Sequence, residues 1–108
     1  MGMRRNIQLN YEKDKKIYLY THWGADGLEK TLAVSLQRGK ERCDDESYLA
    51  RIIFTDMTSG VSDSLTGYGI APYEVDPEYP TLKVDLVAKT VNKVPYMDFI
   101  ENPDMFAI

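Results

Sequence analysis

The sequence is poor in the residues that most often carry catalysis or bind metals. Its 108 residues include one cysteine, one histidine and one tryptophan, which are Cys43, His22 and Trp23. A single cysteine excludes an internal disulfide, and one cysteine with one histidine falls short of the four ligands of a structural zinc site. A Cys43–His22 nucleophile pair would require contact in space that sequence spacing does not establish. We therefore expect no metal site and no cofactor.

Long apolar runs are also missing. No segment approaches the roughly 20 apolar residues that a membrane-spanning helix needs, so no membrane contact is expected. The N-terminus reads Met-Gly-Met-Arg-Arg-Asn and lacks the apolar stretch of a signal peptide. With 44% hydrophobic and 28% charged residues, the chain has the composition of a globular protein. We expect a single domain over residues 1–108, located in the cytoplasm.

Positive charge is scarce in the second half of the chain. Residues 55–108 hold three Lys and Arg against nine Asp and Glu, a net charge of −6, whereas residues 1–54 hold ten against eight, for +2. Phosphate-backbone binding needs clustered cations, so a nucleic-acid partner is unlikely on this count. A DNA site would have to be assembled from Arg4, Arg5, Lys13, Lys15, Lys16, Arg38 and Arg42. The acidic half instead suits a partner protein with a basic surface.

The stretch from Ile17 to Glu29 organises the chain. Its first part predicts a strand whose side chains alternate between two faces. One face would carry Ile17, Leu19, Thr21 and Trp23, and the other Tyr18, Tyr20 and His22. Gly24 and Gly27 then break the strand. Asp26 is placed to cap the following helix, with Glu29 three residues later completing a variant capping box, and Trp23 is expected to fill the core above that helix.

Apolar periodicity predicts the remaining elements. Strands are expected near residues 6–11, 17–23, 67–75, 82–86 and 90–94, and helices over 27–38, from Asp45 toward Gly60, and over 96–101. Strands flanking a helical pair are typical of an α+β fold. The sequence thus predicts a single mainly antiparallel sheet of about five strands, with two helices packed on one face and a short C-terminal helix.

Tyrosines provide the main functional signal. Tyr18 and Tyr20, with Tyr68 or Tyr73 from a neighbouring strand, would form an aromatic patch on the sheet face that the helices leave open. Tyrosine is enriched in protein interfaces because it buries a large area and keeps a polar tip. Burial of this patch by the end of the chain is an equally open alternative.

Four motifs carry a resemblance that covers about residues 17–101. They are Tyr20-Thr21-His22-Trp23-Gly24, Arg38-Gly39-Lys40 with Asp44-Asp45, residues 48–54, and residues 65–70. In these the chain resembles a group of small bacteriophage and prophage proteins, often actinobacterial, that have no assigned activity. An aromatic residue often stands at the position of Cys43 in that group. The resemblance implies a phage-type accessory protein, a class in which inhibitors of host proteins are common.

Two functional hypotheses follow. The first is a non-catalytic interaction module that binds a host protein, or a second copy of itself as a homodimer, through Tyr18, Tyr20, His22, Tyr68 and Tyr73. The alternative is a small enzyme or a small-anion or nucleotide binder centred on His22, with Asp26 or Arg38 as helper. Its basis is that a lone histidine meets a glycine turn and a helix N-terminus.

Overall fold

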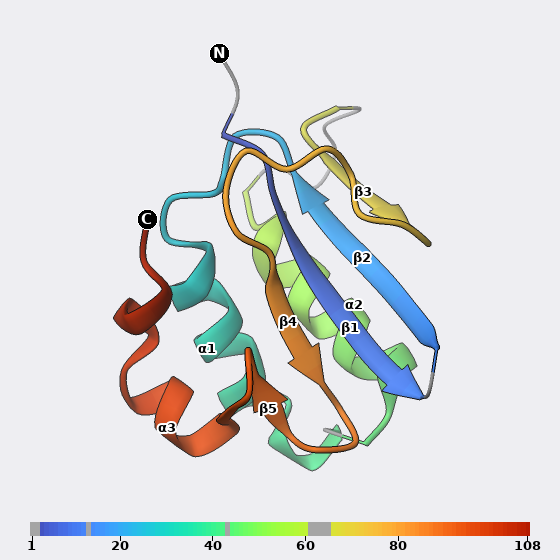
Figure 1. Cartoon of the computed structure of the whole chain (residues 1–108), viewed down its shortest axis with the longest axis vertical. Helices are drawn as coiled ribbons and strands as arrows, with labels where there is room; N and C mark the ends of the chain where they lie inside the picture. The colour runs from blue at the N-terminus through green and yellow to red at the C-terminus, as the bar shows by residue number, and fades with distance from the viewer. Residues whose placement is uncertain (1–2, 13, 43, 61–65) are drawn as a thin grey trace.

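One sheet runs through the molecule, with the two longest helices behind it (Figure 1). The computed structural model describes residues 3–12, 14–42, 44–60 and 66–108. Among these residues six strands join in the order β3-β2-β1-β4-β5-β6. The strands are β1 (Arg5–Glu12), β2 (Lys15–Thr21), β3 (Tyr68–Ala71), β4 (Leu82–Asp85), β5 (Thr90–Val91) and β6 (Val94–Pro95).

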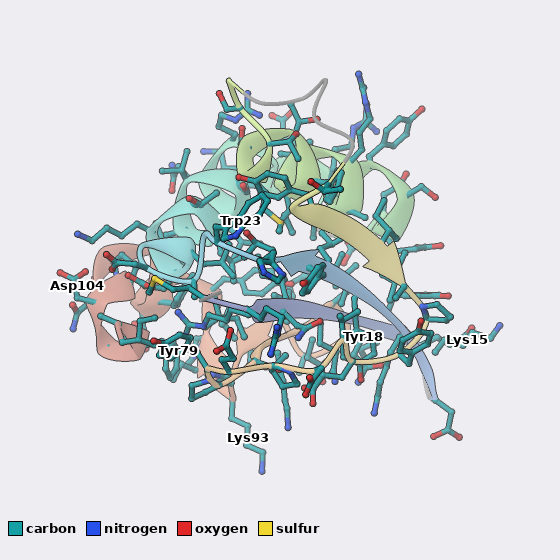
Figure 2. All side chains as sticks on the ribbon, turned by 90° about the horizontal axis from the view of Figure 1, so that it is seen from above. Lys15, Tyr18, Trp23, Tyr79, Lys93 and Asp104 are labelled. Atoms are coloured by element: carbon teal, nitrogen blue, oxygen red, sulfur yellow. The ribbon has the colours of Figure 1, made fainter. Side chains whose placement is uncertain are left out.

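The described helices are α1 (Leu28–Arg38), α2 (Glu46–Met57) and α3 (Tyr96–Glu101), with short 3₁₀ turns η1 (Lys40–Arg42) and η2 (Pro103–Phe106). Seen from above, α1 and α2 lie on one side of the sheet (Figure 2). The predicted α+β class is therefore confirmed, and α3 begins and ends at the expected residues. None of the helices in the described chain is both long and apolar enough to cross a membrane.

The sheet is more complex than the sequence predicted. It is mixed, because β1 and β4 pair in parallel, with Ile7 opposite Leu82 and Leu9 opposite Val84. The strand expected over 90–94 is a tight hairpin of β5 and β6 instead. Its two turn residues, Asn92 (φ 48°) and Lys93 (φ 71°), adopt left-handed conformations, as a type I′ turn requires.

The hydrophobic core lies between the sheet and the helices. Alternation along β1 directs Ile7 and Leu9 inward, and Leu19 of β2 joins them. From the helices come Leu28, Leu32 and Leu36 of α1 and Leu49, Ile53 and Met57 of α2, all buried. These residues repeat at intervals of about four, as one face of a helix requires. The two buried faces follow the apolar periodicity from which both helices are predicted, although Tyr48 of α2 is exposed.

A buried ion pair also holds α1 against β1. Arg5 and Glu29 are both almost fully buried and form an ion pair of 3.0 Å. The same guanidinium donates to the carbonyl oxygens of Pro80 at 2.8 Å and Phe106 at 2.8 Å. Burial lowers the pKa of Arg5, whereas the charge and hydrogen bond of Glu29 raise it. Glu29 is therefore a buried partner of β1 rather than part of a capping box. Gly27 takes the N-cap position, so the prediction that Asp26 caps α1 is wrong.

The other face of the sheet is covered by the chain itself at one end. Residues 72–81, which we call the crossover, pass from β3 to β4 in front of the sheet (Figure 2). The Asn6 amide nitrogen donates to the Val75 carbonyl at 2.7 Å, and the Val75 N–H donates to the Asn6 side-chain oxygen at 3.1 Å. The N–H groups of Glu78 and Tyr79 donate to the Arg4 carbonyl. The crossover thus leaves only part of this face open.

Candidate functional site

Three neighbouring side chains form an aromatic cluster where β2 ends, which we define as Tyr20, His22 and Trp23. The Tyr20 hydroxyl and His22 Nδ1 form a hydrogen bond of 2.7 Å. The His22 ring meets the Trp23 ring edge-on, with centroids 5.0 Å apart and planes at 74°. Such edge-to-face contacts orient aromatic rings. The cluster therefore presents its outermost ring in a defined orientation.

Trp23 does not fill the core as expected, because its side chain is 56% exposed. The strand β2 ends at Thr21, whose hydroxyl accepts the Gly24 N–H at 2.9 Å and turns the chain. Alternation therefore stops before Trp23. Its ring rests on Gly67, where an added Cβ would lie 2.3 Å from the indole. The exposed Trp23 ring (labelled in Figure 2) thus packs against backbone that carries no side chain.

Carboxylates gather at the same end of the sheet. The Met3 N–H donates to the His22 carbonyl at 2.7 Å, which places Arg4 beside the aromatic cluster. Arg4 is shared by Asp76 at 3.6 Å and Glu78 at 3.7 Å, and Asp26 is exposed on the loop after Trp23. Arg4 offsets one of the two carboxylates with which it pairs, so the described side chains here carry negative charge on balance. A basic partner would be attracted to this end of the sheet.

The expected tyrosine patch is only partly assembled. Tyr18 and Tyr20 lie half-buried on the open face, where the Tyr18 hydroxyl accepts the Gln8 amide at 2.9 Å. Tyr68 pairs with Thr21, whose side chain is buried on the helix side, and packs against the core. Tyr68 therefore cannot share a patch with Tyr18, and this part of the prediction is wrong. Tyr73 is 65% exposed at the start of the crossover, outside any described strand.

The structure offers His22 few partners for catalysis. Its Nδ1 is bonded to Tyr20, and His22 lines neither the hollow on the open sheet face described below nor the one beside Tyr11 and Glu12. Arg38, considered as its helper, pairs with Asp56 at 2.9 Å. The first turn of α1 already contains the Glu29 carboxylate, which disfavours an anion there. Among the described residues no three His, Cys, Asp or Glu side chains are grouped for a metal, and Cys43 lies outside those residues.

The cations considered for nucleic-acid binding do not form one patch. Arg5 is buried, and Arg4, Lys15 and Arg38 are each paired with carboxylates. The Arg42 guanidinium lies over the Tyr48 ring, 5.2 Å from its centroid. Lys13 lies outside the described residues.

A feature that the sequence did not predict is a hollow of about 640 Å³ on the open sheet face. We call it the polar hollow. Its floor comes from β1, β4 and the β5–β6 turn, and the crossover forms its wall. The residues that matter below are Gln8, Asn10, Tyr79, Lys83, Asn92 and Lys93.

A sequence signal for this hollow exists. Asn6, Gln8 and Asn10 alternate with Ile7 and Leu9 along β1, a pattern that by itself predicts a half-buried strand. Asn6 and Gln8 are in fact buried polar residues on a central strand. Polar residues at such positions need partners, which indicates that something polar lies over them. The crossover is that partner for Asn6.

Comparison with known proteins gives no relative. No protein-family model, curated protein or solved structure matches the chain.

Proposed function

We propose that this chain is a non-catalytic interaction module whose contact surface is centred on the aromatic cluster. The observation that carries the proposal is Trp23, which is exposed by 56% and yet held by the His22 ring and by Gly67. Tryptophan and tyrosine are enriched among the residues that dominate binding energy at protein interfaces. A ring that is already oriented loses little conformational entropy when a partner covers it.

The chemistry around the cluster supports a protein with a basic surface as the partner. Asp76 and Glu78 pair with Arg4 at the same end of the sheet, and Asp26 is exposed on the loop after Trp23. Opposite charge at the rim of an interface raises the association rate and selects the partner. The resemblance to phage and prophage proteins makes a protein of the bacterial host the expected partner, and inhibition of that protein the expected result. A second copy of the chain is the competing partner.

Relative to the sequence-based hypothesis, the proposed surface moves from the middle of the sheet to its end. Tyr20 and His22 stay in it as supports of Trp23, whereas Tyr68 lies on the opposite face. Tyr18 is bonded to Gln8 and contributes at most to the edge of the surface.

The test compares two exposed aromatic residues of similar accessibility. Trp23→Ala should abolish co-purification of a specific protein from the bacterial host, whereas Tyr48→Ala, at a residue 53% exposed on α2, should retain it. Light scattering of both variants would show whether the lost partner is a second copy. If Trp23→Ala leaves every partner and the molar mass as in the wild type, the proposal is wrong.

A further inference from the structure

The polar hollow brings together the free positive charges of an otherwise acidic half of the chain. Residues 55–108 contain three cationic side chains, Lys83, Lys89 and Lys93. Lys89 is paired with Asp44, while Lys83 and Lys93 both line the hollow. Neither of these two lysines forms an ion pair within the part of the chain that the structure describes. Two exposed lysines therefore stand at one hollow, and the Lys93 side chain projects outward from the body of the protein (Figure 2).

The carboxylates of the hollow are occupied by other groups. Asp85 accepts the N–H groups of Val87 and Ala88, both at 2.9 Å, which closes the turn after β4. Glu74 accepts the Thr81 hydroxyl at 2.5 Å. These hydrogen bonds orient the two carboxylates but do not remove their charge, so the two lysines and two carboxylates of the hollow cancel in net charge. The attraction for an anion therefore comes locally from Lys83 and Lys93, which form no ion pair with either carboxylate among the described residues.

The backbone holds these groups in place. The Lys83 N–H donates to the Asn92 side-chain oxygen at 2.7 Å, and the Asn92 N–H donates to the Lys83 carbonyl at 2.8 Å. On its other side Lys83 stands opposite Gln8 of β1. The Asn92 and Lys93 turn has left-handed backbone angles in both residues. A rigid hairpin thus positions Lys93 next to the Lys83 strand.

Uncharged groups complete the lining. Asn92 contributes a side-chain NH2 group that can donate hydrogen bonds, and Tyr79 contributes a half-buried ring on the crossover side. Pro77 and Pro80 add apolar wall beside that ring. A volume of about 640 Å³ lies within the range of small-molecule sites.

We propose that the polar hollow binds a small phosphorylated molecule that carries a planar polar ring, of the nucleotide class. Lys83 and Lys93 hold the phosphate, the Asn92 side-chain NH2 donates to the ring edge, and Tyr79 contacts the ring face. Lysine is a common phosphate ligand, and aromatic side chains stack on bases of every kind. This site is separate from the aromatic cluster, so it is independent of the proposed interaction surface.

The test titrates the wild-type protein with the four common nucleoside monophosphates, with ribose phosphate and with inorganic phosphate, and follows the amide NMR spectrum. We expect shifts at residues 8–10, 79–85 and 90–93 with at least one nucleotide. Ribose phosphate and inorganic phosphate distinguish the sources of the phosphate, and both should bind at least about tenfold more weakly than that nucleotide. Equal binding of inorganic phosphate, shifts elsewhere, or no shift at millimolar nucleotide would each overturn the proposal.

Variants provide a matched control. Lys83→Gln and Lys93→Gln should each weaken nucleotide binding about tenfold or more, because each removes one charge-assisted hydrogen bond. Lys89→Gln removes the same charge at a residue outside the hollow, and like Lys93 it has a left-handed backbone (φ 57°). It should bind like the wild type. Equal loss in all three variants would indicate a general charge effect and overturn the proposed site.

Discussion

Arg5 and Glu29 form an ion pair of 3.0 Å although both side chains are almost excluded from solvent, at 1% and 2% exposure. Because Arg5 also donates to carbonyl oxygens of the crossover and of η2, this one side chain connects β1, α1 and both later segments. A buried charge is costly without its partner, so the fold depends on the whole set being intact.

Removing the charge of Glu29 should therefore destabilise the protein strongly. Glu29→Gln is expected to lower the free energy of unfolding by roughly 3 kcal/mol, since it leaves Arg5 buried without a counter-charge. Urea denaturation measures the change. The neighbouring Lys30→Gln breaks only an exposed ion pair with Asp104, at 3.7 Å, and should cost less than about 0.5 kcal/mol. Similar losses in the two variants would show that the buried pair has no special role.

The position of the Trp23 ring should depend on the absence of a side chain at Gly67. Gly67 has φ +96°, and a Cβ there would lie 2.3 Å from the indole, so Gly67→Ala must displace the ring. We expect a loss of stability of at least about 1–2 kcal/mol and a shift in tryptophan fluorescence. Gly60→Ala is the control, because Gly60 has a similar φ of +85° with nothing within 4 Å. An unchanged emission spectrum in Gly67→Ala would contradict the observed contact.

The crossover should loosen when Asn6 is changed. Asn6→Ala removes both hydrogen bonds to the Val75 backbone, and we expect a loss of about 1–3 kcal/mol in stability. Hydrogen exchange at the Val75 amide should accelerate more than at Leu86, whose N–H donates to the Asn10 carbonyl and serves as an internal reference. Equal acceleration at the two amides would mean that Asn6 stabilises the fold globally rather than the crossover.

The segment containing η2 should contribute to stability through two contacts. The Phe106 carbonyl accepts from Arg5 at 2.8 Å, and the Phe106 ring lies 5.8 Å from that of Phe99. Removing residues 103–108 should lower the unfolding free energy by about 2 kcal/mol or more, whereas removing Ile108 alone should have little effect. Thermal denaturation distinguishes the two. Equal melting temperatures would show that neither contact matters.

The sequence predicted the elements whose signal is local. Leucines at intervals of four defined the face of α1, and α2 begins within the acidic segment expected at its start, where the Asp45 side chain accepts the Tyr48 N–H at 3.2 Å. The predictions from sequence were wrong where a residue far away in the chain determines what a side chain contacts. Glu29 fits a capping box by spacing, but its partner Arg5 lies 24 positions earlier, and no local pattern reveals that pair.

Two misplacements at the candidate sites have the same origin. Trp23 continues the alternation of β2 in sequence, yet the Thr21–Gly24 turn ends the strand first. Tyr68 looked like a neighbour of Tyr18 because both are strand tyrosines. The register, which pairs Tyr68 with Thr21, places it on the other face. A shift of one residue in register reverses every side chain, so faces cannot be assigned from a single strand.

The left-handed backbone of Lys93 has a consequence for engineering. A left-handed backbone with φ 71° costs less conformational free energy for glycine than for lysine, because the Cβ atom of lysine is strained there. Lys93→Gly is thus expected to gain up to about 1 kcal/mol in thermal or chemical resistance while deleting one cation from the sheet surface. At the proposed ligand site, loss of the Lys93 cation is the cost that would offset this gain in stability.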